Sequence, residues 1–265
     1  MVSYARPGRI FDGYVFDLDG TVYLGDRLLP GASQTVGRLR ELGKTVVFLS
    51  NNPLHTRDEY AAKLTRLGIP TVPDAVINSS YVLVRHLQRT ARRARLFVIG
   101  EESVRTELRR AGLTLTEDPR QTDIVVACFD RTFDYRKLQG AFDAIRGGAR
   151  FIATNRDPYC PTPEGGVPDC GAIVAAIEAA TGHAVEDVVG KPSGIMAGVI
   201  RERLGAAVRG SLMVGDRLET DLALARAAGM ASAIVLTGAT DEAMLARWPD
   251  RPDFVLPGIA DVLPG

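Results

Sequence analysis

Short apolar runs rich in β-branched and aromatic residues alternate along the chain with segments of helical spacing. The runs lie at residues 14–16, 46–49, 96–99, 124–127, 151–152, 212–214 and 233–236, and each predicts a buried strand. Between the first two, Val36, Leu39 and Leu42 share one helical face that ends at Gly43. Strand and helix alternating at this spacing require crossover connections, so we predict an α/β protein with a largely parallel sheet.

The carboxyl ends of these strands are where a site is expected. After the second strand, Thr56 and Glu59 have the spacing of a capping box, and the helix they begin is predicted to end at Gly68. In open parallel sheets the connecting loops and the helix N-termini converge at the carboxyl edge. The candidates are therefore the polar residues that follow apolar runs, namely Asp17, Ser50 and Gly215-Asp216. Lys191 follows the segment 188–190, Val-Val-Gly, in the same manner.

Composition and charge narrow the class of protein. The 265 residues have a mass of 28.5 kDa, enough for one large or two small domains. Lys and Arg total 32, as do Asp and Glu, so we expect no nucleic acid and no membrane as partner. Cys128, Cys160 and Cys170 show no C-x-x-C spacing and cannot all pair. With no apolar signal segment or membrane-length run, we expect a cytoplasmic protein.

The strongest chemical signal is the segment 17–21, Asp-Leu-Asp-Gly-Thr. Two carboxylates two residues apart share a strand face and repel when both are ionised. A divalent cation would keep Asp17 ionised and nucleophilic, and a turn at Gly20 could carry Asp19 to the far side of a bound phosphate as general acid and base. The alternatives are a plain strand end with turn-forming aspartates, or half of a calcium loop, which apolar residues 21–23 weaken.

A further acidic segment follows the run 212–214. Asp216 would add a third hard oxygen ligand, as a magnesium site with few protein carboxylates requires. Asp221 could orient a bound water or hold Lys191, or it could only cap the helix predicted at residues 222–228.

Two more segments offer partners for a phosphate. Ser50, Asn51 and Asn52 supply a hydroxyl and amides, although the same letters suit an ordinary turn. Pro192 is predicted as the first helical residue, which places the Lys191 ammonium at a helix mouth, whereas a lone lysine is otherwise a solvated surface residue. Together these strand ends supply a nucleophile, an acid, a metal site and a phosphate clamp.

In this order, D-L-D-G-T, S-N-N, G-K-P-S and G-D-R-L-E-T-D resemble the haloacid dehalogenase superfamily of phosphohydrolases. Segments 152–158 and 213–218 resemble its subgroup with a type-IIA cap, which contains the NagD-type phosphatases, the 4-nitrophenylphosphatases and pyridoxal phosphate phosphatase (chronophin). The resemblance implies a three-layer Rossmann-like parallel-sheet core with an inserted α/β cap. The core would comprise residues 1–79 plus 187–265 and the cap residues 80–186.

The resemblance also implies a Mg²⁺-dependent phosphatase that hydrolyses a small phosphomonoester, such as a sugar phosphate or a nucleotide, through a phospho-aspartate. Asp17 would attack the phosphoryl group, and Asp19 would protonate the leaving oxygen and then activate water. Mg²⁺ would be held by the Asp17 carboxylate, the Asp19 backbone carbonyl and Asp216. The residues implied to bind phosphate are Ser50, Asn51, Asn52 and Lys191, with Asp221 in support.

In the cap, residues 157–163 align with the subgroup's substrate-specificity loop. Its prolines predict a stiff loop that begins at Asp157 and holds Tyr159 and Cys160 toward the substrate. The pyridoxal phosphate phosphatases carry a histidine where Cys160 stands, which speaks against pyridoxal phosphate as substrate, and Cys160 could also be a small packing residue. Cap-to-cap dimers occur in the subgroup, so a homodimer through the cap is a further expectation.

Other functions stay open at the level of sequence. A phosphotransferase or mutase of the same superfamily would pass the phosphoryl group to a sugar instead of water. A regulatory protein could accept phosphate without turnover. A signalling receiver domain is one such protein, but receivers are shorter than this chain and carry their acceptor aspartate after a middle strand.

Overall fold

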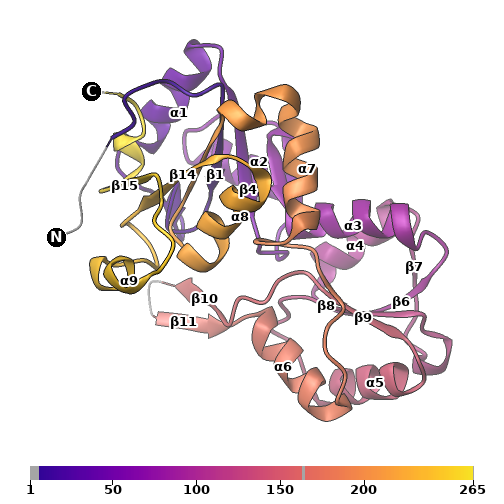
Figure 1. Ribbon diagram of the computed structural model, residues 1–265. Coiled ribbons are helices and arrows are strands. Elements are labelled where there is room, and N and C mark those ends of the chain that lie inside the picture. Colours follow the sequence, from indigo (N-terminus) through magenta and orange to yellow (C-terminus); the bar gives the residue numbers. More distant parts are fainter. Residues whose placement is uncertain (1–5, 163–164, 265) are drawn as a thin grey trace. The chain divides into compact units, whose positions relative to one another are not determined.

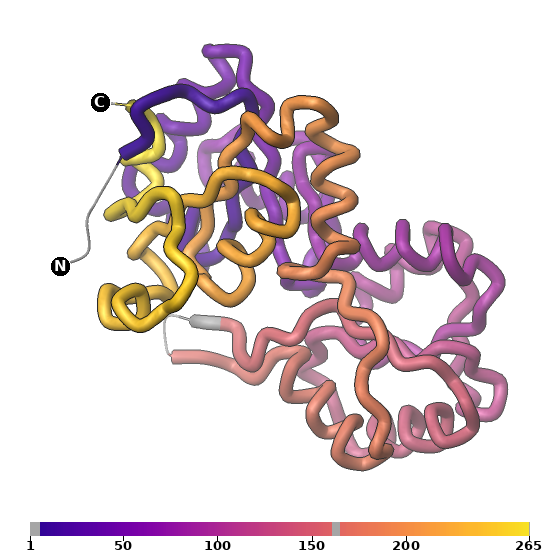
Figure 2. Tube along the Cα trace, viewed as in Figure 1, coloured from indigo at the N-terminus to yellow at the C-terminus, as the bar shows by residue number. Residues whose placement is uncertain are grey.

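The structure is a computed structural model that describes residues 6–162 and 165–264, and these form two compact units. Unit 1 comprises residues 6–50, 58–77 and 191–264, and unit 2 comprises residues 51–57 and 78–190. The described start and end of the chain both belong to unit 1 (Figure 2), so unit 2 is an insertion along the sequence. The expected domain bounds stay a prediction; the units differ from them chiefly in assigning residues 51–57 to unit 2.

Six strands form the parallel sheet of unit 1 in the order β15-β14-β13-β1-β4-β5. Their bounds are β1 Gly13–Asp17, β4 Thr45–Ser50, β5 Val76–Asn78, β13 Leu212–Gly215, β14 Ala231–Val235 and β15 Phe254–Leu256. The chain adds β4 and β5 on one side of β1 and then returns to add β13, β14 and β15 on the other. This reversal creates a switch point between β1 and β13, the place where such sheets bind ligands.

Helices cover both faces of this sheet (Figure 1), as the sequence pattern predicted. On one face lie α1 Ala32–Glu41, α2 Arg57–Arg66 and the short helix η5 Ile259–Asp261. On the other lie α7 Gly194–Leu204, the π-helical turn η4 Leu218–Leu222, α8 Ala223–Ala228 and α9 Glu242–Arg247. The remaining elements are the hairpin β2 Tyr23–Leu24 and β3 Arg27–Leu28, and the 3-10 helices η1 Pro73–Ala75 and η3 Gly205–Gly210.

Burial explains why the strands of unit 1 read as continuous apolar runs. Every residue of β1 is buried, because helices pack against both of its faces. Tyr14 and Phe16 point to the face with α1 and α2, where they pack with Phe48 of β4 and Leu39 of α1. Phe16 lies opposite Val214 of β13, so the residues that follow each of them reach the carboxyl edge of the sheet side by side.

Five parallel strands form the sheet of unit 2, in the order β12-β9-β8-β6-β7. They are β6 Arg95–Ile99, β7 Thr114–Leu115, β8 Ile124–Ala127, β9 Arg150–Ala153 and β12 Asp187–Val188. Its helices are α3 Ser79–Thr90, α4 Glu102–Arg110, α5 Tyr135–Arg146 and α6 Cys170–Thr181, with a 3-10 turn η2 Pro119–Gln121. Helices α5 and α6 pack on the sheet in a core of their own around Phe97, Val125 and Phe151.

One local expectation is wrong. The sequence predicted a stiff loop at residues 157–163, but Tyr159–Thr162 form a strand, β10, which pairs antiparallel with β11 Gly165–Pro168. Backbone pairing with β11 therefore orders residues 159–162. Residue 163 lies outside the described residues. The three cysteines are free thiols. Among residues 6–162 and 165–264, no helix combines the length and apolar character that crossing a membrane requires.

Candidate active site

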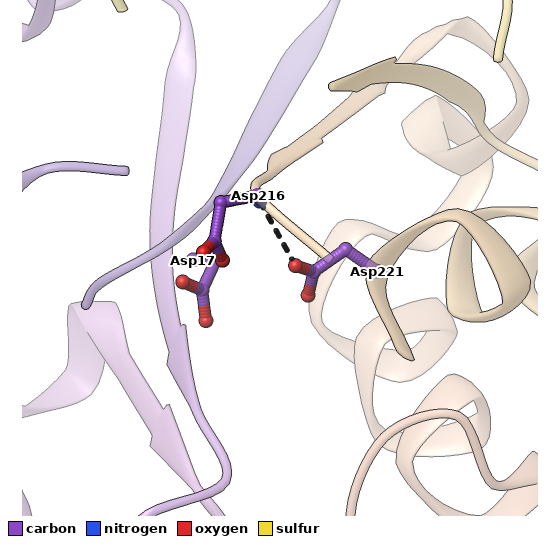
Figure 3. Close-up of side chains that lie close together, drawn as sticks. All are labelled: Asp17, Asp216 and Asp221. Atoms are coloured by element: carbon purple, nitrogen blue, oxygen red, sulfur yellow. Dashed lines mark hydrogen bonds between the residues drawn. The ribbon is translucent and has the colours of Figure 1, made fainter. Parts of the chain in front are cut away.

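Three carboxylates meet at the carboxyl edge of the unit 1 sheet (Figure 3). Asp17 is the last residue of β1, Asp216 directly follows β13, and Asp221 belongs to the π-helical turn η4. One oxygen from each lies within 4.8 Å of the others, and all three side chains are buried. The prediction from the strand ends placed Asp17 and Asp216 at this edge, and the switch point between their adjacent strands brings them together.

Lys191 lies within this cluster. Its Nζ is 2.5 Å from Asp17 Oδ1 and 2.7 Å from Asp221 Oδ1, and its side chain is 4 % exposed. A buried ammonium requires such partners, because its desolvation is otherwise uncompensated. The expectation that Pro192 begins the helix is wrong: α7 begins at Gly194, since the Ser193 hydroxyl accepts from a backbone N–H of the first turn and takes the N-cap.

Asp221 orients its neighbours. Its Oδ1 accepts from Lys191, and its Oδ2 accepts from the backbone N–H groups of Asp216 at 3.1 Å and Arg217 at 3.0 Å. A β-carbon on Gly215 would lie 2.2 Å from the Asp221 Cγ, so the close approach requires glycine there. Asp221 therefore fixes both the loop that carries Asp216 and the lysine. From the sequence, holding Lys191 was one alternative for Asp221, and a simple helix cap was another.

A loop that the sequence analysis did not single out holds Asp216 from the other side. The Ala239 N–H donates to Asp216 Oδ2 at 2.6 Å, and the Thr237 hydroxyl donates to the Gly20 carbonyl at 2.6 Å. A β-carbon on Gly238 would lie 2.0 Å from the same Asp216 oxygen. These residues follow β14, so the rule that selected the other strand ends, applied to the run 233–236, would have found them.

The electrostatics of the cluster favour a cation. Burial raises the pKa of Asp17 well above its ordinary value, with Lys191 opposing and the other two aspartates adding to the rise. Burial and then repulsion from Asp221 raise the pKa of Asp216 to about 6. Burial disfavours the charged form of Lys191, but Asp17 and Asp221 outweigh it and raise that pKa. One ammonium thus leaves excess negative charge, which a divalent cation would neutralise.

The second aspartate of the N-terminal motif has a different setting. Asp19 is partly exposed and, among the described residues, its carboxyl takes part in no hydrogen bond. Burial raises its pKa, while the charges of Lys63, Lys191 and Arg217 lower it. A carboxyl whose pKa is raised holds a proton more readily than a free carboxyl does, as a general acid must. Its side chain is outside the three-carboxylate cluster.

The predicted phosphate-binding segment is divided between the units. Ser50 ends β4 in unit 1, where its hydroxyl lies 3.2 Å from the Tyr60 hydroxyl. Asn51 and Asn52 open the short segment 51–57 of unit 2. Asp17 lies opposite Leu49 in the sheet, so Ser50 follows at the same edge.

Within unit 2, the asparagines lie beside the predicted specificity segment. Asn51 Nδ2 donates to Asp157 Oδ2 at 2.9 Å, and Asn52 Nδ2 lies 3.8 Å from Cys160 Sγ. The Tyr159 side chain is 47 % exposed. The structure thus brings Asn51, Asn52, Asp157 and Cys160 together in one unit, as it brings Asp17, Lys191, Asp216 and Asp221 together in the other.

Comparison with known proteins agrees with this geometry. Residues 14–114 match the family model of haloacid dehalogenase-like hydrolases, and residues 188–262 match a second model described as HAD-hydrolase-like. The chain is 37 % identical to the sugar-phosphatase AraL of Bacillus subtilis over 94 % of its own length and 91 % of the relative's. It is 36 % identical to chronophin of Rattus norvegicus, over 96 % of its own length and 87 % of the relative's.

Among solved structures, the 4-nitrophenylphosphatase from Thermotoga maritima superposes with a TM-score of 0.90 at 37 % identity, covering 95 % of this chain and 96 % of that one. At this identity and coverage the likeness extends beyond the fold to the family. The chain therefore belongs to the haloacid dehalogenase-like hydrolases, in the phosphatase subfamily IIA of the NagD, 4-nitrophenylphosphatase and chronophin type.

Proposed function

We propose that the protein is a Mg²⁺-dependent phosphatase that hydrolyses a small phosphomonoester through a phospho-aspartate at Asp17. The observation that carries this proposal is the buried cluster of Asp17, Lys191 and Asp216 at the switch point of the unit 1 sheet. A lone surface lysine or a simple turn does not account for an ammonium held between two buried carboxylates. Hydrolysis of a phosphate ester needs this combination of a nucleophile with positive charge beside it.

In the proposed reaction, a carboxylate oxygen of Asp17 forms a bond to phosphorus while the bond to the ester oxygen breaks. Asp19 gives its proton to the leaving oxygen, in keeping with its raised pKa. Asp19 then takes a proton from water, which attacks phosphorus and releases Asp17 and inorganic phosphate. Lys191 fixes the Asp17 side chain and offsets charge on the phosphoryl oxygens, while Asp221 holds the lysine in place.

The residues present fit a magnesium ion. Among the described residues, Asp17 Oδ2 and Asp216 Oδ1 accept no hydrogen bond, whereas both oxygens of Asp221 are occupied. We therefore assign the metal to the carboxylates of Asp17 and Asp216, with the backbone carbonyl of Asp19, and assign Asp221 to orientation. When bound, Mg²⁺ would neutralise these carboxylates and polarise the phosphoryl oxygens.

The substrate is proposed to be a small phosphomonoester. The relatives named as sugar-phosphatase, chronophin and 4-nitrophenylphosphatase support this class. Ser50, Asn51 and Asn52 are proposed to bind phosphate, and Tyr159 and Cys160 on the hairpin to face the leaving group. We further propose that unit 2 acts as the cap. A homodimer through the cap and a cytoplasmic location stay predictions from the sequence.

The test is hydrolysis of 4-nitrophenyl phosphate with and without Mg²⁺. We expect turnover that EDTA abolishes, and slow phosphorylation without turnover in Asp19→Asn, detected as acid-stable labelled protein after exposure to a radiolabelled phosphoester. A parallel reaction with excess glucose separates hydrolysis from phosphotransfer, since a transferase would form sugar phosphate in place of free phosphate. Turnover that is the same with EDTA as with Mg²⁺ would contradict the assigned metal. Wild-type turnover in Asp17→Asn would contradict the assigned nucleophile.

A further inference from the structure

A closed turn follows β1 in unit 1. The Leu18 carbonyl accepts from the backbone N–H groups of Val22 at 2.9 Å and Tyr23 at 3.2 Å, and the Gly20 N–H donates to the Tyr23 carbonyl at 2.8 Å. Gly20 has a φ of 87°, in the left-handed region that favours glycine. These bonds fix the orientation of the peptide group that precedes Gly20.

That peptide group also contains the Asp19 carbonyl. In a trans peptide the N–H and the C=O point in opposite directions, so the bond from the Gly20 N–H to Tyr23 directs the Asp19 carbonyl away from Tyr23. Among the described residues, no hydrogen bond reaches the Asp19 carbonyl. The orientation of this peptide therefore decides where an oxygen that is assigned to the metal points.

The next carbonyl of the turn is held by the loop that follows β14. The Thr237 hydroxyl donates to the Gly20 carbonyl at 2.6 Å, and Gly20 is buried, so this carbonyl depends on a donor from the protein. The same loop holds Asp216, because the Ala239 N–H donates to its Oδ2 at 2.6 Å and the Thr240 N–H to its backbone carbonyl at 3.1 Å. The loop thus ties the turn to a carboxylate of the cluster.

The turn and the Asp216 carboxylate are in close contact. A β-carbon on Gly20 would lie 2.6 Å from Asp216 Oδ2 and 3.0 Å from the Gly238 Cα. A rotation of the Gly20 peptide groups would therefore move the Asp19 carbonyl relative to Asp216, and these are two of the groups assigned to one ion. The bond from Thr237 opposes such a rotation, because it fixes the peptide group that follows Gly20.

We propose that Thr237 is a positioning residue whose hydroxyl holds the turn in the conformation that directs the Asp19 carbonyl to Mg²⁺. The inference rests on the proposed function, in which this carbonyl, Asp17 and Asp216 bind the ion. Without the hydroxyl, the buried Gly20 carbonyl lacks a donor, and this conformation of the turn is no longer favoured. Mg²⁺ binding must then restore the conformation, so the apparent Kd rises as the fraction of competent protein falls.

Calorimetric titration of the full chain with Mg²⁺, without substrate, measures this effect. Thr237→Val keeps the branched shape of the side chain and removes the hydroxyl. We expect it to raise the Kd for Mg²⁺ about tenfold, the effect of one buried acceptor left without its donor. Thr237→Ser keeps the hydroxyl, so its Kd should stay within about twofold of the wild-type value.

A matched control separates positioning from a general loosening of unit 1. The buried Thr35 hydroxyl donates to the Ile259 carbonyl at 3.3 Å, and this bond joins α1 to η5 without involving a residue of the site. Thr35→Val should lower the melting temperature and leave the Kd for Mg²⁺ unchanged. If Thr237→Val does not fold, Thr237→Ala takes its place, with the same expected rise in Kd.

The possible results are distinct. The inference is overturned if Thr237→Val changes the Kd for Mg²⁺ no more than Thr35→Val does, or if Thr237→Ser raises the Kd as much as Thr237→Val does. The proposed function still stands in that case, provided that the wild-type protein binds Mg²⁺ and hydrolyses the ester. If the wild-type protein neither binds Mg²⁺ nor hydrolyses the ester, the proposed function fails and the inference falls with it.

Discussion

Replacement of Lys191 by methionine tests the charge balance of the site. Methionine is unbranched and close in length to lysine, so the packing is largely kept while the ammonium is removed. The change leaves Asp17 and Asp221 without the charge that lies 2.5 and 2.7 Å from their oxygens. Removing one member of a buried ionic cluster costs about 3–5 kcal/mol, and we expect unit 1 to lose that much free energy of unfolding near pH 8 without metal.

The loss should depend on pH. In Lys191→Met, Asp17 and Asp221 lose their attractive partner, so the folded state binds a proton more readily than the wild type does. One extra proton taken up between about pH 8 and pH 5.5 restores about 3 kcal/mol, at 1.36 kcal/mol for each pH unit. The difference in stability between variant and wild type should therefore shrink to about 0–2 kcal/mol at the lower pH.

Urea unfolding followed by tryptophan fluorescence measures this difference. Trp248 is the only tryptophan and packs against a buried cluster of unit 1 that includes Leu222 and Leu245, so its signal reports on that unit. Lys44→Met is the matched control, because Lys44 lies 4.0 Å from a mostly exposed Asp12 and such a pair contributes little. The charge-balance argument is refuted if Lys191→Met loses no more free energy of unfolding than Lys44→Met does. It is also refuted if the loss in Lys191→Met is the same at both pH values.

Three further predictions follow from the same cluster. Metal-free protein should be more stable near pH 5 than near pH 7 by about 1.3 kcal/mol, because the pKa of Asp216 is about 6 in the folded state against 3.8 ordinarily. Mg²⁺ should remove this dependence, and unfolding curves at both pH values measure it. Asp17→Asn should abolish turnover, because the nucleophile is removed. It should not lower the stability of metal-free protein, because burial and the neighbouring aspartates oppose ionisation of the Asp17 carboxyl. A hydrolysis assay and a melting curve check the two expectations. Gly238→Ala should weaken Mg²⁺ binding, measured calorimetrically, at least tenfold, whereas Gly37→Ala, which meets no atom within 4 Å, should not.

Local patterns in the sequence determined the architecture and the identity of most site residues. Apolar runs bounded by polar residues predicted strands that the structure contains, since a strand buried on both faces must be apolar throughout. The same patterns selected Asp17, Ser50 and Asp216, because the parallel strands β1, β4 and β13 end at one edge of the unit 1 sheet. They also selected Lys191, but the strand before it, β12, belongs to the unit 2 sheet, so a shared strand edge does not explain its place in the cluster. The shortest elements, such as Phe254–Leu256 of β15, carry too few residues for a periodic signal.

Only the tertiary structure decided how these residues work together. Asp221 holds Lys191 and the amides of the Asp216 loop, the Ala239 amide holds Asp216, and Asp157 pairs with Asn51 across 106 residues of sequence. Such contacts depend on the order of strands in the sheet and on where glycines permit close approach. Hydrophobic periodicity is a property of adjacent residues and has no information on partners so far apart. The sequence thus determines which chemistry reaches the sheet edge, and the fold determines which groups hold which.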